Sequence, residues 1–190
     1  DEAAVDFGGL GVWMYDGGGW SQLDDGEVEG LAALDIDGSG DDEILVDAAD
    51  GGLLLWDSGL ASQLSASDVE GMAVGDLDAN GDEEVLADLG TSGLWIYDFG
   101  YWTQFSGVNP DFVAFAQLNG TGFQEVVADF GSVGLWVRQG TGWFQVSGVN
   151  ADFFACGDTD GNGTAEVVGD FGATGLWLYN AGSWTQLSGV

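Results

Sequence analysis

The sequence predicts an all-β protein built as a β-propeller, and three observations lead to this fold class. One pattern returns every 41 residues, as from Asp35 to Asp76, which fits the roughly 40–45 residues of a four-stranded blade. Glycine occurs 35 times and proline once, which indicates many turns between short strands. No window of helical length shows a 3.6-residue apolar period free of glycine. We therefore expect about five blades.

Four columns of residues keep the 41-residue step without insertion or deletion. They hold the start of an acidic loop, a mid-strand aspartate, a tryptophan interrupted only by Ala61, and a glutamine: Asp35, Asp76, Gln117, Asp158; Asp6, Asp47, Asp88, Asp129, Asp170; Trp20, Trp102, Trp143, Trp184; Gln22, Gln63, Gln104, Gln145, Gln186. The columns describe a single repeat domain, 1–190, with units 1–27 (partial), 28–68, 69–109, 110–150 and 151–190.

Each unit contains the pattern of four strands. In the second unit, the small apolar stretch 29–34 predicts a first strand that leads into the acidic loop. The β-branched run 43–47 predicts the second strand, and 52–56 and 62–64 predict the third and the short fourth, with glycine turns between them. Later units repeat this reading, for example at 125–131, 134–137 and 142–146.

The two ends of the repeat leave one unit incomplete. Asp1 and Glu2 align with Asp42 and Glu43, so the first unit starts inside an acidic loop and lacks its first strand. We expect four complete blades and one without that strand. Either the chain is a fragment of a longer array or a neighbouring copy fills the gap, because an open sheet edge favours strand addition.

The charge of the chain excludes several classes of partner. Asp and Glu total 33, Arg138 is the single cation, and no histidine is present, which gives a net charge of −32. A protein that binds nucleic acid or an anionic membrane surface needs Lys and Arg on its own surface, so these two classes of partner are excluded. The 45% hydrophobic content and nine tryptophans indicate a folded core rather than an acidic disordered tail. Cys156 is alone, which predicts a small buried side chain and no intramolecular disulfide.

The acidic loops predict calcium sites. Counted from Asp35 as position 1, three loops place oxygen-bearing side chains at positions 1, 3 and 5, glycine at position 6 and Glu at position 9. With the carbonyl of position 7, such a loop supplies the six or seven oxygens that Ca²⁺ prefers, whereas Mg²⁺ requires stricter octahedral geometry. The expected ligands are Asp35, Asp37, Ser39, Asp41, Glu43; Asp76, Asp78, Asn80, Asp82, Glu84; Asp158, Asp160, Asn162, Thr164, Glu166.

The loop 117–125 departs from this pattern. Gln117, Asn119 and Thr121 occupy the ligand positions and leave Glu125 as the only charge. We expect this loop to be empty of calcium or to bind it weakly.

The Asp-x-Asp-Gly-x-Gly-x-x-Glu loop, followed by a β run and Asp-Phe-Gly at 6–8, 129–131 and 170–172, resembles the FG-GAP/VCBS repeat. That family is known from integrin α-subunit propellers and from bacterial extracellular proteins of adhesion and polysaccharide processing. The resemblance covers essentially the whole chain and implies calcium at the three loops and no catalytic residue. The Gly-Ala-Pro part of the signature is absent at 171–175, and five units are fewer than the seven of integrin propellers.

Two interpretations of the aromatic columns remain open. Large aromatic side chains pack between propeller blades, which is a structural role. Alternatively, a tryptophan face and a glutamine amide in each unit form repeated weak sugar sites, with candidates Trp20, Trp102, Trp143, Trp184, Gln104, Gln145 and Gln186. The mid-strand aspartates are expected to accept hydrogen bonds from N–H groups of the following glycine turn, or else to line a central channel.

These features favour a non-catalytic, calcium-stabilised propeller, extracellular or at the cell surface, that acts in adhesion or binds a glycan or a surface protein. One alternative is a structural subunit of a calcium-stabilised filament or surface layer, in which the incomplete N-terminal unit self-associates with neighbouring copies. Another is the propeller domain of a polysaccharide-degrading enzyme, although a site present in every unit is seldom catalytic. The excess of acidic residues predicts that the protein works in a salty or calcium-rich environment outside the cell, where ions screen its negative surface.

Overall fold

The computed structural model describes residues 2–49 and 51–189, and these form five antiparallel sheets that follow one another along the chain. The first sheet has three strands and each later sheet has four, with neighbouring strands consecutive in sequence. The fold class is confirmed: the protein is a β-propeller array of four complete blades and one that lacks its first strand. Asp1, which the sequence aligns with an acidic loop, lies outside the described residues.

The strands are short and similar from blade to blade. The first blade contains β1 (Glu2–Asp6), β2 (Val12–Asp16) and β3 (Gly19–Asp24). The second and third contain β4 (Val28–Leu34), β5 (Glu43–Ala48), β6 (Gly52–Asp57), β7 (Leu60–Ser65), β8 (Gly71–Gly75), β9 (Glu84–Asp88), β10 (Leu94–Asp98) and β11 (Tyr101–Ser106). The last two contain β12 (Phe112–Ala116), β13 (Glu125–Asp129), β14 (Leu135–Gln139), β15 (Gly142–Ser147), β16 (Phe153–Gly157), β17 (Glu166–Asp170), β18 (Leu176–Asn180) and β19 (Ser183–Ser188).

A one-turn 3₁₀ helix, which the sequence does not predict, follows the second strand of the motif in four blades. These are η1 (Gly8–Leu10), η2 (Gly90–Ser92), η3 (Gly131–Val133) and η4 (Gly172–Thr174). Each ends at a glycine; Gly134, for example, has φ 86° and ψ −168°, a region that glycine alone adopts readily. Its backbone also approaches the fourth strand so closely that a Cβ atom would lie 2.3 Å from the Ser147 carbonyl oxygen.

The hydrophobic core lies between the blades. The strands β9 and β13 are buried along their whole length, because both faces of a middle strand are covered by neighbouring blades. Leu34, Leu45 and Leu53 of the second blade pack in one cluster with Val85 and Ala87 of the third. Equivalent clusters join the third to the fourth blade and the fourth to the fifth, and the half-buried Cys156 packs in the last of these.

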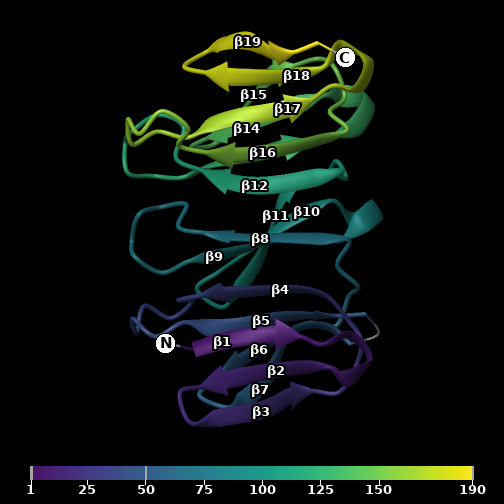
Figure 1. Cartoon of the computed structure of the whole chain (residues 1–190), viewed down its shortest axis with the longest axis vertical. Coiled ribbons are helices and arrows are strands. Elements are labelled where there is room, and N and C mark those ends of the chain that lie inside the picture. The colour runs from purple at the N-terminus through teal and green to yellow at the C-terminus, as the bar shows by residue number, and fades with distance from the viewer. Residues whose placement is uncertain (1, 50, 190) are drawn as a thin grey trace.

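The blades are arranged as an open array (Figure 1). The first strands β4, β8, β12 and β16 lie next to one another in succession, and β1 contacts β4. The first and last blades lie at opposite ends of the molecule, and no comparable contact joins β1 to β16 in the described part of the chain. None of the helices described is long and apolar enough to cross a membrane.

The single cation is part of an interface between blades. The Arg138 guanidinium lies 3.8 Å from the centroid of the Phe105 ring, and its NH1 atom donates to the Phe105 carbonyl oxygen at 3.1 Å. Its Nε atom donates to the Gly140 carbonyl oxygen at 3.2 Å. Arg138 thus joins the third and fourth blades through a ring face and backbone carbonyls.

We expect Gly134→Ala to destabilise the protein by more than about 2 kcal/mol, because backbone strain of roughly 1–3 kcal/mol is added to a steric clash. Gly140→Ala is the matched control: its φ is also positive, at 56°, but a Cβ atom there meets nothing within 4 Å. The control should therefore cost only about 1–2 kcal/mol. Urea unfolding of both variants measures the difference, and equal losses would contradict the close approach of Gly134 to β15.

Candidate metal loops and an inter-blade pocket

The structure brings together the carboxylates of positions 1, 3 and 9 in three loops. In each loop these three residues have ligand oxygens within 4.8 Å of one another: Asp35, Asp37, Glu43; Asp76, Asp78, Glu84; Asp158, Asp160, Glu166. Each loop connects the first strand of its blade to the second, and Glu at position 9 is the first residue of that second strand. Loops that connect strand to strand therefore form three similar acidic clusters, each able to hold a metal ion.

Backbone N–H groups fix the shape of these loops. The glycine at position 6 has a positive φ, 86° at Gly40 and 97° at Gly81, which turns its N–H toward position 1. The N–H of Gly40 donates to Asp35 Oδ2 at 2.9 Å, and the N–H of Gly81 donates to Asp76 Oδ2 at 3.1 Å. The same bond recurs in the last loop at 2.8 Å. The glycine thereby orients the first carboxylate toward the cluster.

The position-9 glutamate is buried at the base of each loop. It accepts the N–H of position 2, with distances of 3.1 Å at Glu43, 2.7 Å at Glu84 and 2.9 Å at Glu166. Burial raises the pKa of Glu43, and it raises the pKa of Glu84 to about 7, with the nearby aspartates contributing in the same direction.

Several carboxylate oxygens inside the clusters have no donor. Asp35 Oδ1, Asp76 Oδ1 and Glu166 Oε1 are buried and accept no hydrogen bond from the described residues. A buried carboxylate oxygen without a donor is costly unless a cation meets it. Because the surrounding groups are hard oxygen ligands, the residues fit a divalent cation of the Ca²⁺ type.

The side chains at position 5 close the loop. Ser39 Oγ, Asn80 Oδ1 and Asn162 Oδ1 accept the N–H of position 7 at 3.3, 2.6 and 2.7 Å. The carboxylate of Asp82 points away from its own loop, since a Cβ atom on Gly38 of the preceding loop would meet Asp82 Oδ1. Of the predicted ligands, the structure therefore gathers the carboxylates of positions 1, 3 and 9. The side-chain oxygen of position 5 is held by the position-7 N–H, and the ligand roles of this oxygen and of the position-7 carbonyl stay predictions.

The loop 117–125 has the same shape but different chemistry. The Asn119 Nδ2 atom donates to Glu125 Oε1, and the N–H of Gly120 donates to Gln117 Oε1 at 3.0 Å. An amide N–H thus lies against the glutamate where the other three loops present a carboxylate. The position-9 glutamate of this loop, Glu125, thus accepts a hydrogen bond from a side-chain amide, whereas the same glutamate in the other three loops lies beside two aspartates.

The predicted sugar-binding side chains make contacts inside the protein. The Trp102 Nε1 atom donates to the Leu64 carbonyl oxygen at 2.9 Å, and Trp184 Nε1 donates to the Val146 carbonyl oxygen at 2.8 Å, both on the preceding blade. Trp143 packs edge-on against Phe105 and Phe130, whereas Trp20 is half exposed. The three glutamine amides donate to backbone carbonyl oxygens of their own blades: Gln104 to Ser92, Gln145 to Val133 and Gln186 to Thr174. These contacts favour the structural interpretation of the two columns, and the sugar-binding interpretation stays a prediction.

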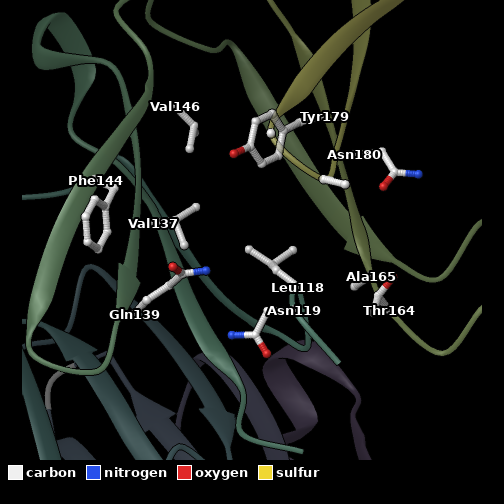
Figure 2. Close-up of a pocket in the computed structure, with 12 residues that line it drawn as sticks. Leu118, Asn119, Val137, Gln139, Phe144, Val146, Thr164, Ala165, Tyr179 and Asn180 are labelled. Atoms are coloured by element: carbon white, nitrogen blue, oxygen red, sulfur yellow. The ribbon is translucent and has the colours of Figure 1, made fainter. Parts of the chain in front are cut away.

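A pocket of about 410 Å³, which the sequence does not predict, lies between the last two blades (Figure 2). Val137, Gln139 and Phe144 form one wall, and Tyr179 and Asn180 form the other. Leu118 and Asn119 of the loop 117–125 lie between the walls, and Thr164 and Ala165 come from the adjacent acidic loop. The lining combines apolar and aromatic surface with amide and hydroxyl groups.

A change in the repeat columns marks this pocket. Gln139 and Asn180 occupy the column that holds Asp16, Asp57 and Asp98 in the first three units. Asn119 likewise replaces the position-3 aspartate of the other loops. Neutral amides thus replace carboxylates at the last blade interface, and this loss of acid is the signal by which the sequence could have revealed the pocket.

The mid-strand aspartates bind the glycine turn, as predicted. Asp6, Asp88, Asp129 and Asp170 each accept with Oδ1 the N–H of the glycine two residues later, at 2.7–3.1 Å. Asp47, after which the described residues 48–49 and 51–57 contain no 3₁₀ helix, has a buried Oδ1 atom without a partner among the described residues. Burial raises the pKa of Asp47 and of Asp88 to about 6.

Comparison with known proteins shows structures of similar fold but no sequence family for this chain. No protein-family model and no curated protein match the sequence. A lectin from Agrocybe aegerita that recognises non-reducing terminal N-acetylglucosamine has a similar structure, with TM-score 0.64 and 18% identity over 95% of this chain and 60% of that one. BBS1N in complex with ARL6DN is also similar, with TM-scores of 0.61 and 0.63 in its lead- and mercury-soaked crystals and 11% identity over 97% of this chain and 56% of that one. The chain spans well under two thirds of these structures, and the similarity shows the β-propeller fold alone.

The raised pKa values predict that stability without divalent ions falls as the pH rises. A carboxyl with a folded-state pKa near 6 and an unfolded value near 3.8 stabilises the fold fully below about pH 4, and this contribution is lost through pH 6. In chelator, the melting temperature should fall between pH 4.5 and 7. Asp88→Asn, which keeps the acceptor for the Gly90 N–H, should reduce this slope more than Asp25→Asn at an exposed position. Equal slopes would contradict the role of burial at Asp88.

Proposed function

We propose that the protein is a non-catalytic, calcium-stabilised propeller, extracellular or at the cell surface, that binds neutral glycans in the pocket between its last two blades. The observation that carries the proposal is a neutral pocket in a chain whose net charge is −32. Everywhere else in the same repeat columns the chain places carboxylates. Their replacement by amides at one interface indicates a ligand that needs hydrogen bonds and no charge.

The pocket has the chemistry of a saccharide site. A sugar ring offers C–H faces to apolar side chains and hydroxyl groups to amides, and Phe144, Tyr179, Gln139 and Asn180 supply both kinds of surface. Its volume lies within the roughly 300–1,000 Å³ of small-ligand pockets. The lectin similarity is consistent with such a ligand, since N-acetylglucosamine, which that protein recognises, is neutral.

The metal loop borders this pocket directly. Thr164 and Ala165 line the pocket and belong to the loop that holds Asp158, Asp160 and Glu166. A calcium ion in that loop would fix the position of one pocket wall. The FG-GAP/VCBS resemblance supports the same ion, and glycan binding should therefore depend on calcium.

The lining offers little for catalysis. Among the described residues that line the pocket, Tyr179 is the only one with an ordinary titratable group. Glycoside hydrolysis normally uses a pair of carboxyl groups across the scissile bond. The chain has many carboxylates, but those of the metal clusters occur in three equivalent copies, which is expected of stabilising sites.

Calcium should raise the unfolding free energy by about 2.7 kcal/mol per occupied site at 100-fold excess over the dissociation constant. Glu84→Gln removes one charged ligand and should remove about one site's share of the calcium-dependent shift in melting temperature. Glu125→Gln is the matched control and should leave the shift unchanged, because Glu125 already accepts an amide N–H. A melting temperature that is the same in calcium and in chelator would refute the calcium assignment.

A glycan array probed with the calcium-loaded protein tests the sugar proposal, with neutral N-acetylglucosamine-terminated and acidic glycans side by side. We expect signal on neutral glycans that chelator abolishes. Asn180→Asp combined with Gln139→Glu restores acid to this column and should weaken binding at least tenfold, because each amide that can donate to a sugar hydroxyl becomes a charged carboxylate that can only accept. Asn150→Asp adds a similar charge at an exposed position outside the pocket and should have no effect. Absence of signal with a normal calcium shift would refute glycan binding alone.

A further inference from the structure

One interface is repeated between the blades of this chain. The tryptophan of the fourth strand contacts the preceding blade at the residue 38 positions earlier: Trp102 bonds to Leu64 and Trp184 bonds to Val146. At the interface between them, Trp143 packs edge-on against Phe105, with 5.8 Å between ring centroids. All six side chains are half-buried members of the clusters that join blades.

The terminal blades expose the two halves of this same interface. Trp20 of β3 is 50% exposed, and Leu187 of β19, which occupies the column of Leu64, Phe105 and Val146, is 54% exposed. The strands β3 and β19, which contain these two residues, lie at opposite ends of the array (Figure 1). Each exposed half therefore has an internal precedent for the surface that fits it.

The exposed tryptophan is already arranged for such a contact. Trp20 packs against Phe7 and Tyr15 with centroid distances of 5.5 and 5.3 Å. Trp184, which binds the preceding blade, packs against Phe171 and Tyr179 at 5.3 and 5.1 Å. The aromatic cluster at the free face thus matches one that is engaged, and little rearrangement is needed on association.

We propose that the first blade of one copy of this chain docks on the last blade of a second copy, with Trp20 packed against Leu187 of the other molecule. The contact is heterologous, because two different faces meet, so it can continue from copy to copy. It continues an interface that the chain already uses and requires neither a glycan nor calcium, so it goes beyond the function proposed above.

The charge of the chain sets the conditions for this association. Two molecules of net charge −32 repel each other, and the range of that repulsion falls from ~8 Å at 0.15 M salt to ~3 Å at 1 M. We therefore expect the association to strengthen with salt, which is opposite to an interface held by ion pairs.

Light scattering during size-exclusion chromatography of the full 190-residue chain tests the proposal at about 0.1 M and 1 M NaCl. Wild type should form concentration-dependent oligomers at high salt. Trp20→Ala and Leu187→Glu should each weaken association by roughly 30-fold or more, as expected for a central interface residue. Tyr101→Ala removes another exposed aromatic and should leave association unchanged. Circular dichroism establishes that the variants remain folded.

Mixing the two blocked variants distinguishes this contact from nonspecific association. Each variant keeps one intact face, so an equimolar mixture should form a dimer and nothing larger. A wild type that stays monomeric at both salt concentrations would overturn the proposal. So would variants that oligomerise like wild type, or a mixture that forms no dimer.

Discussion

The fold depends on how a chain with 33 acidic residues and one cation satisfies its buried carboxylates. Backbone N–H groups do most of this work. The second strand of a blade begins with a glutamate that accepts from the acidic loop and ends with an aspartate that accepts from the glycine turn, as at Glu84 and Asp88. These bonds tie both ends of a buried strand to its connections. Where no N–H reaches a buried carboxylate oxygen, as at Asp35 Oδ1, a cation is the remaining group that could satisfy it.

The one cation does not relieve this demand. Arg138 occupies the column of Tyr15, Tyr97 and Tyr179, and its guanidinium lies against the Phe105 ring as an aromatic side chain would. A planar guanidinium can stack on a ring and still donate to two carbonyl oxygens, whereas a tyrosine has a single O–H donor. Arg138 is therefore best understood as a packing residue of the interface between the third and fourth blades.

Features that arise within one unit could be predicted from the sequence, and features that arise between units could not. The strands, the acidic clusters and the bond from the glycine turn to Asp88 all follow from residues close together in the chain. The role of Trp184 could not be decided, because an indole has both an apolar face and a donor, and its acceptor lies on another blade. The pocket is likewise formed by two units, because Gln139 and Asn180 belong to different blades, and only the loss of acid in their column marks it in the sequence. The 3₁₀ turns are too short to show a periodicity.

The contiguity of the blades has a consequence for how the chain folds. Each sheet is made from one uninterrupted stretch of sequence, and packing joins each blade chiefly to the next. Strand pairing consequently requires closure of short loops only, a topology associated with fast folding and with nearest-neighbour coupling of repeats. Unfolding can then begin at either end of the array and progress inward. The terminal blades are covered on one side only and are therefore the part of the molecule least protected against unfolding. A neighbour packed on a terminal blade would protect that outermost sheet before any other.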